Sequence, residues 1–261
     1  MNIAQHTDLA VSLTKREIAT RYVGSFVGAI WSFVNPLLLL AVYTLIFGLV
    51  FKAKWGGQED TLTLDFALIL FVGLIVFIFF SECVMRAPTL ISSQPNFVKK
   101  IVFPLPILPV SIVLAAGFHA LISLLAWLAM YVFVHGAPAI TIIAAPLVLV
   151  PLLLGTLGVV FFLSSLGVFV RDISQVVTVL TQSLLFLSPV FYSVEQAPGI
   201  LASILAVNPL SYVMEELREV LMFGRWPDLL SWLQHTVGSL VVAWLGYKWF
   251  QKTRDGFADV L

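Results

Sequence analysis

The sequence predicts an all-α integral membrane protein with six transmembrane helices and both termini in the cytoplasm. Apolar residues make up 60% of its 261 residues and charged residues only 11%. The mean hydropathy of +1.03 lies well above that of soluble domains. The charged residues stand at the ends of long uncharged runs. A helix needs about 20 such residues to cross a hydrocarbon core of about 30 Å, so the charges mark the span boundaries.

The first two spans are bounded by charges on either side. The uncharged run between Arg21 and Lys52 predicts a helix over residues 26–51, which the Asn35-Pro36 pair is expected to kink. A second helix is predicted over residues 64–84, and its centre is purely apolar.

The next run, between Lys100 and Arg171, contains no Lys, Arg, Asp or Glu and is too long for a single span. Gly136 and Pro138 break the helix near its middle. The run therefore predicts two helices, over residues 106–134 and 142–170. Two more spans are predicted further along the chain. These are residues 176–192 and 229–247.

The distribution of basic residues predicts the orientation. With the N-terminus inside, ten of the fourteen Lys and Arg residues fall on the cytoplasmic side, where short loops are enriched in them. Residues 1–25 then form a cytoplasmic interface segment and residues 248–261 a cytoplasmic tail. The whole chain is expected to form one transmembrane domain in the lipid bilayer.

Two segments are predicted not to span. Residues 86–103 form a polar cytoplasmic stretch that is long enough for a short helix along the membrane face, although a solvated loop fits it equally well. Residues 195–228 begin with an apolar piece too short to cross, then turn at Asn208-Pro209. They predict a re-entrant or interfacial hairpin on the outer side, whose charges could instead form a solvated cap.

Several kinds of chemistry are excluded or weakly supported. The chain has no Gly-x-x-x-x-Gly-Lys-[Ser/Thr] loop, so it is not expected to hydrolyse ATP by itself. Its net charge of zero gives no reason to expect nucleic-acid binding. Cys83 is the single cysteine, which excludes a disulfide framework and a metal site with several thiolates, and no metal or cofactor is expected in the chain.

Two candidates for transport or catalytic chemistry remain. His119 is the only ionisable residue predicted near mid-membrane, where such groups tend to be functional, although a hydrogen bond between helices explains it as well. The acidic residues Glu215, Glu216 and Glu219 lack a nearby histidine or companion motif. The chain is therefore not expected to be an enzyme.

Aromatic side chains are plentiful, with 21 Phe, 7 Trp and 6 Tyr. Phe26, Phe33, Phe47 and Phe51 share one face of the first predicted helix. Aromatic faces pack against the CH-rich faces of sugars, and a polymer path needs many weak contacts. Lipid contact or helix packing also explains these side chains, and Trp31 could act as an interfacial anchor.

A series of short motifs resembles one known family, the membrane subunits of type-2 ABC exporters of O-antigen, capsule and teichoic acid polymers. The order and spacing of the motifs, rather than any one of them, carry the resemblance, which covers nearly the whole chain. The motifs are Lys-Arg-Glu-Ile-Ala-Thr-Arg-Tyr at 15–22, Gly28, Trp31, Asn-Pro-Leu at 35–37, residues 43–47, Lys-Lys-Ile-Val-Phe-Pro at 99–104, Val-Phe-Val-Arg-Asp at 168–172, Ser-Pro-Val-Phe-Tyr at 188–192 and Asn-Pro-Leu at 208–210.

The resemblance implies a homodimer that pairs with two copies of a separate ATPase subunit, which would hold ATP and Mg. It implies a coupling helix after the second span and an ATPase interface formed by Lys15, Arg16, Arg21, Ser92, Gln94, Asn96, Lys99 and Lys100. Arg171 and Asp172 would form a cytoplasmic turn, although an ion pair or helix cap is the simpler interpretation. The implied path residues are Phe33, Tyr43, Phe47, Phe191 and Tyr192, and the implied outer gate is Asn208 with Pro209.

The function expected from this resemblance is export of an undecaprenyl-linked glycan across the bacterial inner membrane. A type-2 ABC exporter of drugs or lipids is the nearest alternative and would share the fold. An ion-coupled secondary carrier and a membrane enzyme acting on lipid-linked sugars are further alternatives, for which His119 and the acidic patch are the respective candidates.

Overall fold

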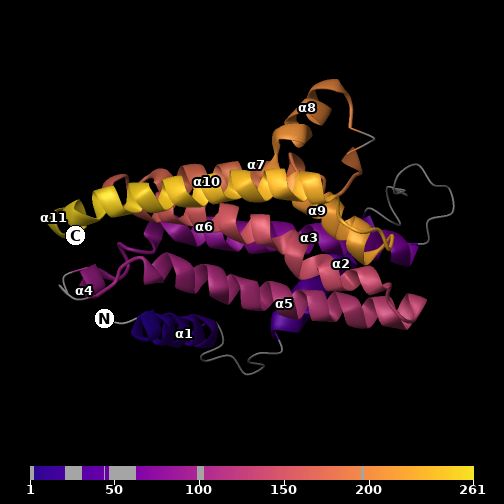
Figure 1. Ribbon diagram of the computed structural model, residues 1–261, viewed down its shortest axis with the longest axis horizontal. Coiled ribbons are helices and arrows are strands. Elements are labelled where there is room, and N and C mark those ends of the chain that lie inside the picture. Colours follow the sequence, from indigo (N-terminus) through magenta and orange to yellow (C-terminus); the bar gives the residue numbers. More distant parts are fainter. Residues whose placement is uncertain (1–2, 21–30, 44, 47–62, 99–102, 195–196) are drawn as a thin grey trace.

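The computed structural model describes residues 3–20, 31–43, 45–46, 63–98, 103–194 and 197–261. Within these ranges the secondary structure is helical, and no strand occurs (Figure 1). The helices are α1 (Ile3–Thr20), α2 (Trp31–Tyr43), α3 (Thr63–Arg86), η3 (Ala87–Thr89), α4 (Pro95–Val98), α5 (Ile107–His135), η4 (Ile140–Ala144), α6 (Ala145–Phe169), α7 (Ile173–Phe186), α8 (Gly199–Val207), α9 (Pro209–Leu221), α10 (Leu229–Thr253), η6 (Arg254–Gly256) and α11 (Phe257–Val260).

Among the described residues, 4 helical segments are long and apolar enough to cross a membrane, and a fifth counts if α8 and α9 form one broken span. The four segments are Leu64–Thr89, Ile107–His135, Ile140–Phe169 and Leu229–Val260. Each contains or overlaps a span predicted from an uncharged run. The prediction of an all-helical, multi-pass membrane protein is therefore confirmed.

The two other predicted spans are less complete. Only Trp31–Tyr43 of the first predicted helix, 26–51, is described as α-helix. The segment predicted as 176–192 contains α7, which begins at Ile173 and ends at Phe186 after 14 residues. Pro189 follows closely, and a proline disfavours the helical conformation of the residue before it. The six-span topology stays a prediction.

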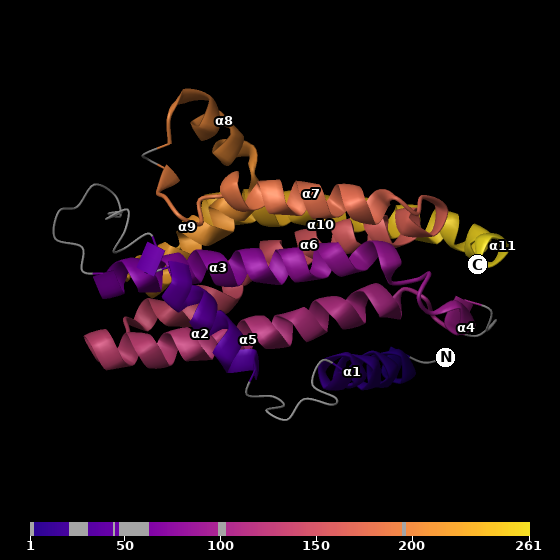
Figure 2. The ribbon, with the colours of Figure 1, turned by 180° about the vertical axis from the view of Figure 1, so that it is seen from behind.

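The long helices lie side by side, and the apolar middle of α3 is at the centre of the core (Figures 1 and 2). Trp127 of α5 is fully buried, and its indole N–H donates a hydrogen bond of 3.0 Å to the backbone oxygen of Leu68. Helices α6 and α10 cross where Gly158 meets Gly246, and a Cβ at either glycine would overlap backbone atoms of the other helix. The absence of side chains there permits the close crossing.

The two ends of the bundle differ. Both termini lie at one end, together with α4 and α11, whereas α8 projects near the other end (Figure 1). Helix α10 continues through Lys248 to Thr253, six residues beyond the predicted end of the last span. The tail that follows is also helical, and its Phe257 is buried against Phe250.

Helix α1 lies alongside α5, at the end of the bundle that holds the termini (Figures 1 and 2). Leu13 is partly buried against the core, while Val11 is exposed. Weak periodicity of apolar residues in this segment agrees with one shallow contact face.

Candidate functional site

The segment after α3 forms two short helical turns at the end of the bundle that holds the termini. Ala87 and Pro88 of η3 are buried, and Asn96 lies exposed on α4. Gly167 near the end of α6 sits directly against Pro88, so that a Cβ at Gly167 would overlap the Pro88 backbone. This glycine lets η3 pack onto α6.

Arg86, at the end of α3, connects this segment to α1. Its guanidinium forms an ion pair with Glu17 of α1 and lies 3.9 Å from the Glu82 carboxylate one turn earlier. The neighbouring Lys15 and Arg16 are exposed on α1. The end of α3 and η3 are therefore in direct contact with α1 and α6.

The other residues predicted for an ATPase interface are placed as follows. The Ser92 hydroxyl donates to the Thr89 backbone oxygen at 3.3 Å, and Gln94 is half-buried. Arg21, Lys99 and Lys100 lie outside the described residues.

The predicted turn between the fourth and fifth spans is present. Arg171 and Asp172 are both exposed between α6 and α7. Asp172 occupies the N-cap position of α7, but its side chain accepts no capping hydrogen bond from the described residues. The turn leaves both charged side chains exposed, whichever role they have.

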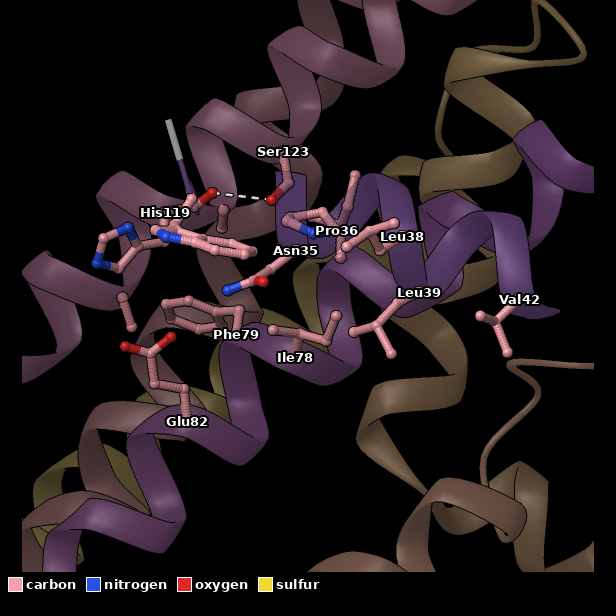
Figure 3. Close-up of a pocket in the computed structure, with 14 residues that line it drawn as sticks. Asn35, Pro36, Leu38, Leu39, Val42, Ile78, Phe79, Glu82, His119 and Ser123 are labelled. Carbon is pink, nitrogen blue, oxygen red and sulfur yellow. Dashed lines mark hydrogen bonds between the residues drawn. The ribbon is translucent and has the colours of Figure 1, made fainter. Parts of the chain in front are cut away.

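A cavity of about 660 Å³ lies between α2, α3 and α5. Figure 3 shows Asn35 of α2, Glu82 of α3 and His119 of α5 pointing into the same space, with Phe79 between them. Trp31 lines the cavity as well. The three polar residues come from distant parts of the sequence, so only the fold brings them together.

His119 was predicted to be functional or to form a hydrogen bond between helices, and the structure places it on the wall of this cavity. Its ring lies edge-on to Phe118, with centroids 5.8 Å apart. Its backbone oxygen accepts a hydrogen bond of 3.0 Å from the Ser123 hydroxyl (Figure 3). Glu82, near the end of α3, faces the same cavity and was not among the predicted site residues.

Two of the predicted path residues are described in full. Phe191 is buried, and its ring lies 6.1 Å from the Phe186 ring, centroid to centroid. The Tyr192 hydroxyl donates to the Phe186 backbone oxygen at 2.8 Å. Phe33 and Tyr43 belong to α2, but their side chains lie outside the described residues, as does all of Phe47. Of the predicted path residues, the structure therefore describes in full only the two that follow α7, and the path itself stays a prediction.

The predicted turn at Asn208-Pro209 separates α8 from α9, whose axes form an angle of 87°. Asn208 caps α9, because its side-chain oxygen accepts a hydrogen bond of 3.0 Å from the Leu210 backbone N–H. Its amide nitrogen donates to the Leu187 backbone oxygen at 3.0 Å and to the Ser188 hydroxyl at 2.9 Å. One residue therefore joins the end of α7 to the start of α9.

Arg218 of α9 is fully buried, although the charges of this segment were thought compatible with a solvated cap. Its Nη1 donates to Glu215 at 2.8 Å, its Nε to the Ile69 backbone oxygen at 3.2 Å, and its Nη2 to the Val190 backbone oxygen at 3.1 Å. Gly73 of α3 leaves the space that the guanidinium occupies. For Arg218, the solvated-cap interpretation is wrong, because its charge is satisfied by partners within the protein.

Two other acidic residues near α9 make local contacts. Glu219 pairs with Arg225 at 3.2 Å. Asp228 caps α10 by accepting the Ser231 backbone N–H at 2.9 Å. Hydrogen bonds from Ser231, through its side chain and its backbone N–H, hold the pKa of the Asp228 carboxyl below its ordinary value. The described residues contain no group of His, Cys, Asp and Glu arranged to hold a metal ion.

The long apolar helices describe a multi-pass membrane protein, and comparison with known families gives its class. Residues 9–222 match the ABC-2 type transporter family. The chain belongs to this family.

Three curated relatives extend over nearly the whole chain. It is 30% identical over 257 residues to the O-antigen export system permease protein RfbA of Myxococcus xanthus, covering 98% of this chain and 96% of that protein. Two proteins of the same name from Klebsiella pneumoniae are 26% and 27% identical over 263 residues, each covering 100% of this chain and 97% of the relative.

Proposed function

We propose that this chain is the membrane-spanning permease subunit of an ATP-driven exporter that moves a lipid-linked, O-antigen-like polysaccharide out of the cytoplasm. The observation that carries the proposal is the end-to-end similarity to three O-antigen export permeases. Similarity that covers both chains almost completely favours a common task over a shared fragment. An exporter of drugs or lipids has the same fold but lacks this support.

The proposed assembly is a homodimer with two copies of an ABC ATPase subunit, in the bacterial inner membrane, with both termini cytoplasmic. ATP and Mg would be held by the ATPase subunits, because this chain carries no phosphate-binding loop of the Walker type. The substrate would be an undecaprenyl-linked glycan. The common position of the two termini at one end of the bundle supports the orientation (Figure 1).

The contacts at that end suggest how the ATPase acts on the helices. A ligand shifts a conformational equilibrium only if it binds two states with different affinity. Under the proposal, the ATPase binds residues 86–98 and α1 differently in its ATP-bound and hydrolysed states. The Arg86–Glu17 ion pair and the Pro88–Gly167 contact would transmit that difference to α3 and α6.

The proposal is tested in the native strain after removal of the chromosomal copy of this gene. Lipid-linked polymer is expected to accumulate on the cytoplasmic side, and plasmid-borne copies are expected to restore polymer at the surface. A tagged chain, extracted in detergent, should copurify with a stoichiometric ATPase. Unchanged surface polymer after gene removal, or transport by the isolated chain without ATP, would overturn the proposal.

Mutation of the coupling contact provides a second test. Gly167→Ala adds a methyl group where the Pro88 backbone lies, which should displace η3. Gly238→Ala is the matched control, because the structure has no atom within 4 Å of a Cβ at that position. Export should fall with Gly167→Ala and persist with Gly238→Ala.

A further inference from the structure

The cavity between α2, α3 and α5 combines an apolar wall with polar groups from each of three helices. Phe79 and Ile78 form part of the wall, and Asn35, Glu82 and His119 face inward (Figure 3). Its volume of about 660 Å³ lies within the range of about 300–1,000 Å³ found for small-molecule sites. Ionisable residues at membrane depth are costly and tend to mark substrate sites. The cavity therefore has the size and composition of a ligand site.

In the proposed orientation, the cavity lies toward the cytoplasmic end of the bundle. Glu82 stands four residues before Arg86, at the end of α3 that leads to η3. Trp31, at the start of α2, lines the cavity and is 40% exposed. A polar group that enters from the side of the bundle at this depth can reach Asn35 and His119 without crossing the whole membrane.

The lining chemistry selects the class of ligand. None of the described lining residues is Lys or Arg, so none of them offers a cation to bind a phosphate. It offers an indole face, a carboxylate, an amide and an imidazole. Carboxylate and amide oxygens accept hydrogen bonds from hydroxyl groups, and an indole packs against apolar CH faces. Together these groups match a sugar ring.

A cationic ligand fits less well. Glu82 would attract a cation, and Trp31 could add a cation–π contact. However, the Arg86 guanidinium lies 3.9 Å from the Glu82 carboxylate and reduces its attraction for a second positive charge. The hydrogen-bonding groups on α2 and α5 would also contribute little to binding a hydrophobic cation.

We propose that this cavity binds a single uncharged sugar residue of the exported polymer, separately from the path predicted along α2 and α7. The inference rests on the proposed function, since it takes the polymer as the substrate. The Trp31 indole would cover one face of the sugar ring, while Asn35, Glu82 and His119 bind its hydroxyl groups. The site would select which glycan the exporter accepts.

The test uses the complete complex of this chain with its ATPase subunits in lipid nanodiscs. The probe is the oligosaccharide released by mild acid from the strain's own lipid-linked polymer. Stimulation of ATP hydrolysis is measured against probe concentration, relative to each variant's rate without probe. Surface polymer in cells is measured in parallel for every variant.

Asn35→Ala, His119→Gln and Glu82→Gln are expected to raise the half-maximal probe concentration about tenfold, because each removes or weakens one hydrogen bond to the ligand. Trp31→Leu should give a similar increase. Trp244→Leu is its matched control, because Trp244 of α10 is 56% exposed and lies outside the cavity. Copurification with the ATPase identifies variants that fail to assemble, and the conservative Gln variants guard against loss of folding.

The outcomes separate the two proposals. Equal half-maximal concentrations for the wild type and all cavity variants would overturn the sugar site while leaving polymer export intact. An export-competent wild type that does not respond to the oligosaccharide would do the same. Stimulation by tetraphenylphosphonium that Glu82→Gln abolishes would overturn it in favour of a cation site. If cells with the wild-type chain export no more polymer than cells without the gene, the proposed function itself would be overturned.

Discussion

The two helices of the bent pair, α8 and α9, differ sharply, although a single residue joins them. In α9, Met214 and Leu217 are completely buried, and the helix packs against α3 and α6. In α8, Ile200 is 82% exposed and Val207 is 84% exposed. Figure 2 shows α8 projecting from the bundle while α9 lies within it. Helix α9 is therefore part of the core, whereas in α8 only Leu205 is buried.

The difference follows from the pattern of apolar residues. The apolar residues of α9 recur every three or four positions and form one stripe that faces the core. Helix α8 is apolar on all sides, which is typical of a helix surrounded by lipid or protein. Under the proposed function, α8 is the half that can move with little loss of core contact, because only its Leu205 is buried, and α9 is its fixed support.

The largest effect on stability is expected from Arg218→Ala. This change removes the buried hydrogen bonds from α9 to Ile69 of α3 and to Val190. It creates a cavity and removes three hydrogen bonds, so it should lower the free energy of unfolding by about 3 kcal/mol. Arg218→Lys should also be costly, because one ammonium group cannot reproduce the geometry of the guanidinium. Titration with denaturing detergent, followed by tryptophan fluorescence, measures both losses.

Arg225→Ala is the control for this prediction. Arg225 also pairs with a glutamate of α9, but its side chain is 74% exposed. Exposed ion pairs contribute about 0–1 kcal/mol. Equal losses for the Arg218 and Arg225 variants would contradict the anchoring of α9.

Gly73→Ala tests the same contact between α9 and α3 by a change in α3. The added methyl group would overlap the Arg218 Nη2 atom, which donates to the Val190 oxygen. Because the guanidinium is fixed by three partners, its displacement should cost about 1–3 kcal/mol. The double variant Gly73→Ala with Arg218→Met should lose less than the sum of the two single changes, and an additive double-mutant cycle would contradict the contact.

Some of these features could be predicted from the sequence, and others could not. The four long helices were predictable because an uncharged run of sufficient length has few alternatives to a span. Asn208-Pro209 was predictable because such a pair favours a turn. The burial of Arg218 was not predictable, since its Ile69 partner lies 149 residues away in the sequence.

The side cavity could not be predicted either, because its lining residues are distant in the sequence. Asn35, Glu82 and His119 belong to three different helices, and no local pattern relates them. The Asn35-Pro36 pair predicts a kink, but it does not predict which polar residues lie near Asn35. Local sequence therefore predicts the elements well, whereas sites formed between elements depend on packing.

A smaller effect is expected from Asn208→Ala, which acts on the junction between the two halves. It removes the cap of α9 and two hydrogen bonds to the end of α7, so the expected loss is about 1–2 kcal/mol. Asn208→Ser retains a capping oxygen but cannot make both contacts with residues 187 and 188, and should lose less. Thermal unfolding in detergent ranks the two variants, and an order opposite to this would contradict the capping role.

The smallest effect on stability is expected in α8. Ile200→Ser and Val207→Ser alter side chains that are exposed within the protomer, so each should change the free energy of unfolding by less than about 0.5 kcal/mol. Val213→Ser in α9 is the matched control, because Val213 is buried and the change should cost well over 1 kcal/mol. If α8 is the moving half of the gate, its two variants should still impair polymer export at unchanged protein levels. Normal export by both variants would show that the surface of α8 is not used, and a large loss of stability would place α8 in a contact that this protomer does not contain.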